Sequence, residues 1–145
     1  SLLAIMGSGK LEAALKVLAA ELGMASNVRF LGQVPGGRRY FAAFDVFALS
    51  SDHEPFGMVL LEAMAAGVPL ICSDCGGGRE VVGDVGRLFP LADAPALATT
   101  LIEQVQGEAA LPVLRQRMLD SLQLHFSDVA VSQRFWSLPM LAALR

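Results

Sequence analysis

The most chemically suggestive stretch of the sequence runs from Asp52 to Glu62 and combines two glutamates with a glycine. Glu54 and Glu62 stand eight residues apart, and Gly57 lies between them. The pattern predicts a loop followed by a helix start, where several backbone N–H groups have no partner inside the helix and the helix dipole favours an anion. Gly57 has no Cβ, so a ligand can approach the chain closely. The segment therefore predicts a phosphate or diphosphate site built from amides.

The two glutamates suggest what kind of diphosphate would bind. Carboxylates beside a diphosphate repel it unless they are occupied by hydroxyl groups, and a nucleotide sugar supplies these from its sugar and its ribose. A plainer interpretation stays open, in which Glu54 only favours a helix N-terminus and Glu62 is a solvated surface residue. The apolar neighbours of Glu62 predict a helix that is buried almost all round, where a lone acid needs a partner.

The elements that must position this segment follow from short apolar runs that alternate with helical periodicity. Such alternation is typical of βα units and a parallel sheet. We predict an α/β fold with one doubly wound parallel sheet and a helical C-terminal tail. The predicted strands are residues 2–6, 28–31, 45–49, 69–72 and 86–89, and the predicted helices are residues 11–22, 38–44, 58–66, 79–82, 94–106, 110–123 and 127–143.

Composition narrows the class of protein further. The chain has 145 residues, of which 54% are hydrophobic and 17% are charged, so it can bury one sizeable core and is not disordered. Its net charge of -3 leaves no basic excess for nucleic acid. No apolar run reaches the ~18 residues of a membrane-spanning helix. We therefore expect a cytoplasmic location and no nucleic-acid partner.

Other motifs that could carry chemistry fail on their spacing. The turn Gly7–Lys10 matches neither a dinucleotide fingerprint nor a P-loop, because the following positions are wrong for both. Cys72 and Cys75 are too close to form a zinc site alone, and Asp74 between them opposes the thiolate of a redox pair. The two histidines lack a metal-ligand spacing, so we expect neither a metal nor a cofactor.

A family resemblance adds to this interpretation. The run Glu54–Pro69 resembles the E-x7-E motif of the group 1 (GT4-type) retaining glycosyltransferases, which use the GT-B fold. Val28–Val34 is similar to the family's VxFLGxV strand, and Tyr40 with residues 45–50 is similar to its Y-x-x-x-D-V strand entry. Residues 73–82 are similar to its SDxGGxxEVV segment. Together these runs cover about residues 1–100 in the family's order.

The resemblance implies a Rossmann-like fold, the C-terminal half of a GT-B enzyme. Residues 1–145 would form the donor-binding domain of a metal-independent retaining glycosyltransferase, which moves a sugar from a nucleotide-diphosphate sugar to a glycan or lipid-linked acceptor. The resemblance also implies a role in polysaccharide biosynthesis. The acceptor would bring the full-length protein to the inner face of the membrane as a peripheral protein.

The resemblance also implies roles for single residues. Glu54 would be the catalytic residue and would contact the hydroxyls of the transferred sugar. The other donor-binding positions that it implies are the ribose ligand Glu62, the base contact Val34 and the backbone amides of Phe56, Gly57, Met58 and Val59.

Two parts of the family pattern have no counterpart in this sequence. One is a basic Arg and Lys pair that clamps the diphosphate, and the other is the amino-terminal, acceptor-binding domain. We therefore expect a donor-binding domain that is truncated at its N-terminus, binds its donor weakly and does not transfer sugar alone.

Two alternatives remain open from the sequence. A nucleotide-sugar epimerase of the GT-B fold would use the same donor pocket with different acid and base residues. A non-catalytic nucleotide-sugar-binding or scaffold domain would keep the fold and lose the chemistry, although the presence of both Glu54 and Glu62 argues against it.

Overall fold

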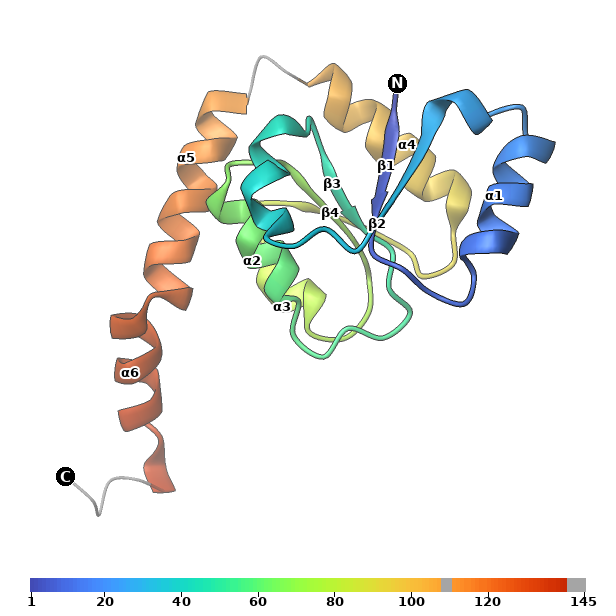
Figure 1. The fold of residues 1–145 in the computed structure, drawn as a ribbon. Helices are drawn as coiled ribbons and strands as arrows, with labels where there is room; N and C mark the ends of the chain where they lie inside the picture. The colour runs from blue at the N-terminus through green and yellow to red at the C-terminus, as the bar shows by residue number, and fades with distance from the viewer. Residues whose placement is uncertain (108–110, 141–145) are drawn as a thin grey trace. The chain divides into compact units, whose positions relative to one another are not determined.

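The computed structural model of the chain describes residues 1–107 and 111–140 (Figure 1). The chain divides into two compact units, Ser1–Arg39 and Tyr40–Arg145. Each unit contains its own parallel sheet with helices beside it. The predicted α/β fold with parallel strands and a helical C-terminal tail is confirmed. The strands pair in two sheets, however, and not in the single sheet that the sequence predicts.

The first unit is one βαβ motif. Strand β1 (Leu3–Met6) pairs in parallel with β2 (Val28–Gly32), and helix α1 (Glu12–Glu21) with a short 3-10 turn (η1, Ala25–Asn27) connects them. Helix α1 ends as the sequence predicts. Gly23 adopts a left-handed φ of 68°, and its N–H donates to the Ala20 carbonyl over 2.9 Å.

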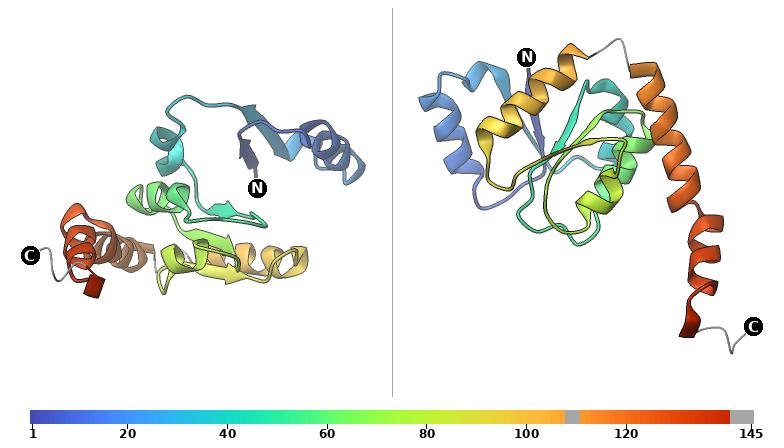
Figure 2. Two further views of the ribbon diagram at one scale, coloured as in Figure 1. Left: turned by 90° about the horizontal axis from the view of Figure 1, so that it is seen from below. Right: turned by 180° about the vertical axis from the view of Figure 1, so that it is seen from behind.

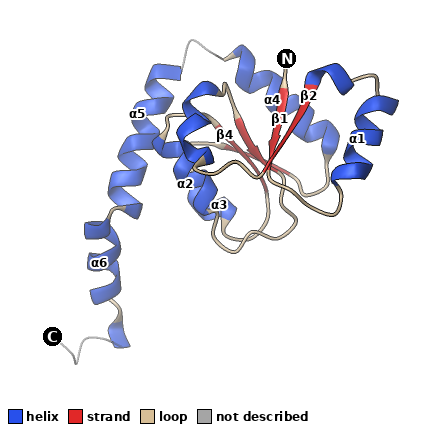
Figure 3. Ribbon diagram, viewed as in Figure 1, coloured by secondary structure: helices blue, strands red, loops and turns tan. Residues whose placement is uncertain are grey.

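The second unit is built on three parallel strands in the order β3-β4-β5. Figure 3 draws the strands in red and labels the central one, β4. These strands are β3 (Phe47–Leu49), β4 (Leu70–Ser73) and β5 (Arg87–Phe89). Helix α2 (Met58–Ala65) connects β3 to β4, and helix α3 (Gly78–Val82) connects β4 to β5. Helices α2 and α3 contact each other and both pack on β4, as right-handed crossovers between neighbouring parallel strands require.

The core of the second unit lies between β4 and its two crossover helices. All four residues of β4 are buried, as a central parallel strand requires. The side chains that complete this core share apolar character and near-zero exposure: Phe41, Leu60, Ala63, Met64, Val81, Val82, Val85 and Phe89. The 3-10 helix η2 (Gly37–Ala43), which falls in the predicted helix 38–44, supplies Phe41.

Helices form the rest of the described chain (Figure 2). Helix α4 (Ala94–Gln106) packs against β5 and matches the predicted bounds. Helix α5 (Leu111–Ser121) packs against α2, and a π-helical turn (η4, Leu122–Phe126) leads into helix α6 (Asp128–Trp136).

The predicted bounds of the tail helices need correction. The last predicted helix, 127–143, ends at Trp136, because Pro139 disfavours a helical backbone at Leu138 before it. The predicted helix 110–123 is regular only from Leu111 to Ser121. Residue 110 and residues 141–143 of these predictions lie outside the described residues.

A substitution at Met118 measures how much the packing of α5 contributes to the stability of the second unit. The Met118 side chain is fully buried on α5, where the helix meets α2. Met118→Ala is expected to lower the free energy of unfolding by about 2–5 kcal/mol, because it leaves a cavity. Urea denaturation of the chain measures this. The control Val113→Ala, on the exposed side of α5, should change it by less than about 0.5 kcal/mol. Equal effects of the two substitutions would contradict the packing of α5 on α2.

Candidate functional site

The start of helix α2 presents backbone N–H groups that no side chain caps. Gly57 precedes the helix with a left-handed φ of 94°, and its carbonyl accepts from the Leu60 N–H over 2.9 Å. Within the described part of the chain, the N–H groups of Met58 and Val59 have no acceptor. These amides and the helix dipole make the start of α2 suited to an anion.

Gly57 is required here for two reasons. Its positive φ is one that L side chains rarely adopt. A Cβ at this position would also lie 2.8 Å from Leu60 Cδ1, a buried core atom. The glycine therefore turns the chain into α2 while it leaves the helix start uncovered.

Glu54 folds back toward this helix start. Its side chain is half-buried, and its Cγ lies 3.7 Å from where a Cβ on Gly57 would be. One carboxylate oxygen, Oε1, accepts a long hydrogen bond of 3.4 Å from the Phe56 N–H. The structure thus brings Glu54, Phe56 and Gly57 together, as the sequence pattern predicts.

Glu62 lies one turn along α2 from the helix start. It stands four residues after Met58, so the two side chains share a face of the helix. The prediction that this helix is buried all round is wrong. Met58 is 63% exposed, and the fully buried side chains of α2 belong to the core face. Glu62 is half-buried at the edge of that face, and its carboxylate has no hydrogen-bond or ion-pair partner among residues 1–107 and 111–140.

A glycine-rich turn holds the Glu54 loop from the side of β4. The N–H of Gly77 donates to the Glu54 carbonyl over 2.7 Å. A Cβ on Gly76 would lie 2.2 Å from that same carbonyl oxygen, and one on Gly77 would lie 2.4 Å from the Pro55 oxygen. Only glycines allow the two backbones to come this close. Sequence reasoning assigned these glycines no role, although three in a row after a strand signal a close approach of backbones.

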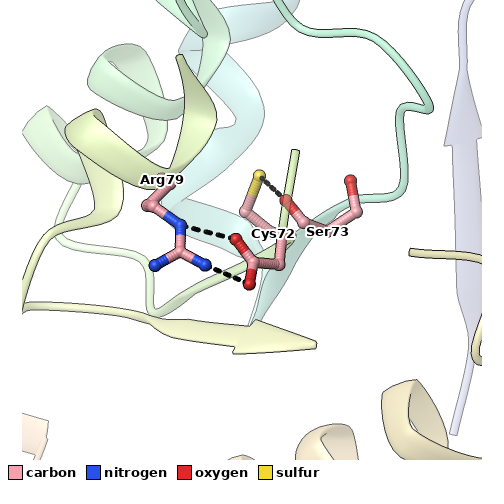
Figure 4. A network of polar contacts seen from close by, with 4 residues as sticks. Cys72, Ser73 and Arg79 are labelled. Atoms are coloured by element: carbon pink, nitrogen blue, oxygen red, sulfur yellow. Dashed lines mark hydrogen bonds and ion pairs between the residues drawn. The ribbon is translucent and has the colours of Figure 1, made fainter. Parts of the chain in front are cut away.

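An ion pair braces this turn from its ends (Figure 4). The Arg79 Nε donates to Asp74 Oδ1 over 2.6 Å, and Arg79 Nη2 pairs with the other carboxylate oxygen. Because both side chains are partly exposed, the ion pair contributes little to the free energy of unfolding, and its main effect is to fix the shape of the turn. Asp74 is also tied to β5, because its N–H donates to the Phe89 carbonyl over 2.8 Å.

The thiols of the two cysteines differ in environment. Burial raises the pKa of Cys72 to about 11, and the neighbouring Cys75 thiol and the negative charge of Glu54 act in the same direction. Cys72 is fully buried on β4, whereas Cys75 is half-buried in the turn. Both thiols are free.

The remaining predicted site residue, Val34, belongs to the first unit. It is half-buried and opens a turn in which its carbonyl accepts from the Gly37 N–H over 3.0 Å. Its contact with a nucleotide base stays a prediction. In the described ranges, no three His, Cys, Asp or Glu side chains gather where they could hold a metal ion. Nor does any helix in those ranges have the length and apolar character needed to cross a membrane.

The π-helical turn η4 adds a contact that the sequence did not suggest. The ring of Phe126 packs edge-on against the ring of Phe56, with 6.3 Å between the centroids. The tail therefore supports the residue that directly precedes Gly57.

The substitution Gly77→Ala tests the close approach of the Gly77 backbone to the backbone of Pro55 and Phe56. Gly77 has a helical φ of -70° and ψ of -16°, so alanine adds no backbone strain there, only a Cβ that meets Pro55 and Phe56. The substitution should lower the free energy of unfolding by about 1–3 kcal/mol, measured by urea denaturation. Gly9→Ala is the control, because nothing lies within 4 Å of its Cβ position. A Gly77→Ala chain as stable as the control would contradict the contact.

The two thiols should react at different rates. At pH 8, iodoacetamide is expected to modify Cys75 roughly tenfold faster than Cys72, because the thiolate is the nucleophile and Cys72 is buried with a raised pKa. Mass spectrometry of the native and the urea-unfolded chain measures this.

The same pKa shift predicts a pH dependence of stability. Cys72 ionises near 9.0 when unfolded and near about 11 when folded, so its contribution to stability is full below pH 9 and is lost as the pH rises through about 11. In the alkylation experiment, equal rates for Cys72 and Cys75 in the native chain would contradict the burial and the raised pKa of Cys72.

Comparison with known proteins places the chain in a family. Residues 2–106 match the family model described as Glycosyl transferases group 1. The chain is 34% identical over 137 residues to the lipopolysaccharide core biosynthesis glycosyltransferase LpsE of Rhizobium meliloti, an alignment that covers 92% of this chain and 40% of LpsE. It is 41% identical over 100 residues to a phosphatidyl-myo-inositol mannosyltransferase of Mycobacterium leprae, covering 66% of this chain and 26% of that protein.

Solved structures with the same architecture are GT-B glycosyltransferases. Sucrose-phosphate synthase of Thermosynechococcus elongatus superposes with a TM-score of 0.80 at 28% identity, over 98% of this chain and 39% of that one. Anabaena HepE in complex with UDP-glucose superposes with a TM-score of 0.63 at 25% identity, over 84% of this chain and 40% of that one. The chain thus spans about 40% or less of the length of these proteins. Because residues 2–106 match that family model and LpsE is 34% identical over 92% of the chain, the chain belongs to the group 1 glycosyltransferase family.

Proposed function

We propose that this chain is the donor-binding domain of a retaining glycosyltransferase that transfers a sugar from a nucleotide-diphosphate sugar without a metal. The observation that carries the proposal is the uncapped start of α2, where the N–H groups of Met58 and Val59 have no acceptor among the described residues and a glutamate stands on either side. The rest of the enzyme would bind the acceptor.

The diphosphate would bind at the N–H groups of Gly57, Met58 and Val59. A helix N-terminus carries roughly half a positive elementary charge, and its free amides point along the axis toward the ligand. Gly57 lets the phosphate oxygens come within hydrogen-bond distance, because no side chain stands in the way. The amides can thereby hold the diphosphate without a cation.

Glu54 would engage the transferred sugar and Glu62 the ribose. The carboxylate of Glu54 lies beside the helix start. A sugar whose diphosphate was bound at the amides would therefore have its hydroxyls within reach of Glu54. Glu62 lies about 6 Å further along the helix axis than Met58, at ~1.5 Å per residue. A half-buried carboxylate without a protein partner is costly, so hydroxyl donors from a ligand would satisfy it. The same hydroxyls keep the two acids from repelling the diphosphate.

Transfer breaks the bond between the anomeric carbon and the diphosphate oxygen, and negative charge grows on the departing diphosphate. The N–H groups of α2 are already oriented toward that charge before the reaction starts. Preorganised donors of this kind stabilise a transition state at no reorganisation cost, which is a large part of many enzymic rate enhancements. In a retaining reaction the oxygen of the acceptor hydroxyl bonds to the anomeric carbon on the same face of the sugar, and its proton passes to the departing diphosphate.

The relatives support a sugar donor of this type and an acceptor built on a glycan or a lipid. HepE, which is similar in structure, was solved with UDP-glucose. Two similar proteins are named for lipopolysaccharide core synthesis and for mannosyl transfer to phosphatidyl-myo-inositol. We infer that the full-length protein acts in polysaccharide biosynthesis from the cytoplasm, as a peripheral protein at the inner face of the membrane where a lipid-linked acceptor is used.

Nucleotide binding tests the proposal. Isothermal titration of the chain with UDP-, GDP- and ADP-sugars should give saturable binding of at least one of them. Glu62→Gln should weaken that binding by roughly tenfold or more, because hydrogen bonds to a charged group contribute about 1.5–3 kcal/mol. Glu54→Gln should weaken the binding of the nucleotide sugar and leave that of the free nucleotide diphosphate within about twofold.

Glu21→Gln is the charge-matched control, because Glu21 is exposed at the end of α1 in the first unit. It should leave both affinities unchanged. The proposal fails if no nucleotide sugar binds at millimolar concentration, or if Glu62→Gln and the control bind alike.

A further inference from the structure

A hydroxyl and a thiol from one side of the sheet converge on a single carbonyl of the Glu54 loop. Ser73, the last residue of β4, donates from its Oγ to the Ser51 carbonyl over 2.5 Å. The Cys75 Sγ donates to the same oxygen over 3.0 Å. A carbonyl oxygen has two lone pairs, so it can accept both.

We propose that Ser73 and Cys75 are positioning residues. They hold the backbone of the Ser51–Glu54 segment in the position in which Glu54 and the amides of α2 can both bind a nucleotide sugar. This inference rests on the proposed function and names residues that neither the E-x7-E motif nor the glycine turn includes. Neither side chain would touch the ligand.

The two ends of the segment are held by one stretch of chain. Ser51 is bound by Ser73 and Cys75, and three residues later the Glu54 carbonyl is bound by the Gly77 N–H over 2.7 Å. A three-residue span whose two ends are both hydrogen-bonded to the same stretch can move little relative to β4. The Glu54 backbone is therefore set by the 73–77 stretch, and its side chain follows.

The anchoring stretch is itself rigid. Ser73 is fully buried at the end of the central strand β4, and its neighbour Asp74 continues the ladder to Phe89 of β5. The Ser51 carbonyl lies two residues beyond the end of β3 at Leu49, where the strand ladder no longer supplies it with a partner. A side-chain donor is needed there, because an unpaired carbonyl away from water is costly.

Cys72 provides an internal comparison. It has the same side chain as Cys75 and is fully buried on β4, but its Sγ donates to the carbonyl of Ser73 over 3.3 Å and not to the Ser51 carbonyl. Figure 4 shows Cys72 and Ser73 beside the ion pair of Arg79. A change at Cys72 disturbs packing without removing the anchor.

Amide hydrogen exchange of the ligand-free chain tests the anchor directly. The double variant Ser73→Ala/Cys75→Ala should exchange the amides of Gly77 and Leu60, which donate to the carbonyls of Glu54 and Gly57, roughly tenfold faster than the wild type. The reason is that it loses two hydrogen bonds of about 0.5–1.5 kcal/mol each. Cys75→Ser should keep the wild-type rates, because a hydroxyl can donate in place of the thiol. Cys72→Ala should lower the midpoint of thermal unfolding and leave these rates within about twofold.

Affinity for the nucleotide sugar gives the second readout. The double variant should bind it roughly tenfold more weakly, while Cys75→Ser and Cys72→Ala should bind it like the wild type. If the double variant does not unfold cooperatively, the single variants Ser73→Ala and Cys75→Ala replace it, with an expected change of about threefold each.

The outcomes separate the two proposals. Wild-type exchange rates in a variant that lacks both donors would overturn the anchor, whatever binds. A wild-type chain that binds no nucleotide sugar would overturn the proposed function, while the exchange rates still decide whether Ser73 and Cys75 hold the loop. The anchor would also be overturned if Cys72→Ala exchanged these amides as fast as the double variant does. The faster exchange would then reflect a lower global stability and not the loss of the two hydrogen bonds to Ser51.

Discussion

The close approach of two backbone segments, the Gly76–Gly78 turn and the loop around Glu54, is the contact on which the rest of the site depends. One hydrogen bond of 2.7 Å joins Gly77 to the Glu54 carbonyl, and Cβ atoms on Gly76 and Gly77 would occupy the space of the opposing backbone. This contact connects the crossover of α2 to the crossover of α3 at the ends of neighbouring parallel strands. In open α/β sheets, ligands bind at such strand ends.

The chemistry of the site follows from what this contact leaves uncovered. With the loop held from the side of β4, Gly57 can start α2 without a side-chain cap on the helix, and the Glu54 side chain lies back toward the helix start. Glu62 stands one turn further on with no partner in the described part of the chain. The two carboxylates would repel a ligand that carries only negative charge. A ligand that carries hydroxyl groups as well as phosphates can donate hydrogen bonds to the carboxylates while the amides bind its phosphates. Nucleotide sugars have that combination.

The sequence was most informative where local rules dominate. The strands and the crossover helices follow from hydrophobic periodicity, and the structure confirms them. Helices α1 and α2 end just before Gly23 and Gly67, which both have a left-handed φ. Glu54, Phe56 and Gly57 are adjacent in sequence, so their gathering at one helix start could also be predicted.

Other features depend on contacts between segments that are distant in sequence. The exposure of Met58 and of one edge of α2 could not be predicted, because it depends on how α5 and the sheet cover that helix. The bond from Ser73 to Ser51 joins residues 22 positions apart, and the contact of Phe126 with Phe56 joins residues 70 apart (126 minus 56). Neither pairing leaves a periodic signal in the sequence.

The central claim, that the free amides of α2 bind the diphosphate of a nucleotide sugar, is tested most directly by nuclear magnetic resonance of the 15N-labelled chain. Titration with a nucleotide diphosphate should shift the amide signals of Gly57, Met58 and Val59 downfield and more than any others in the second unit, because these N–H groups would gain charged acceptors. Unchanged signals at these three residues, with the largest shifts elsewhere in the chain, would contradict the account.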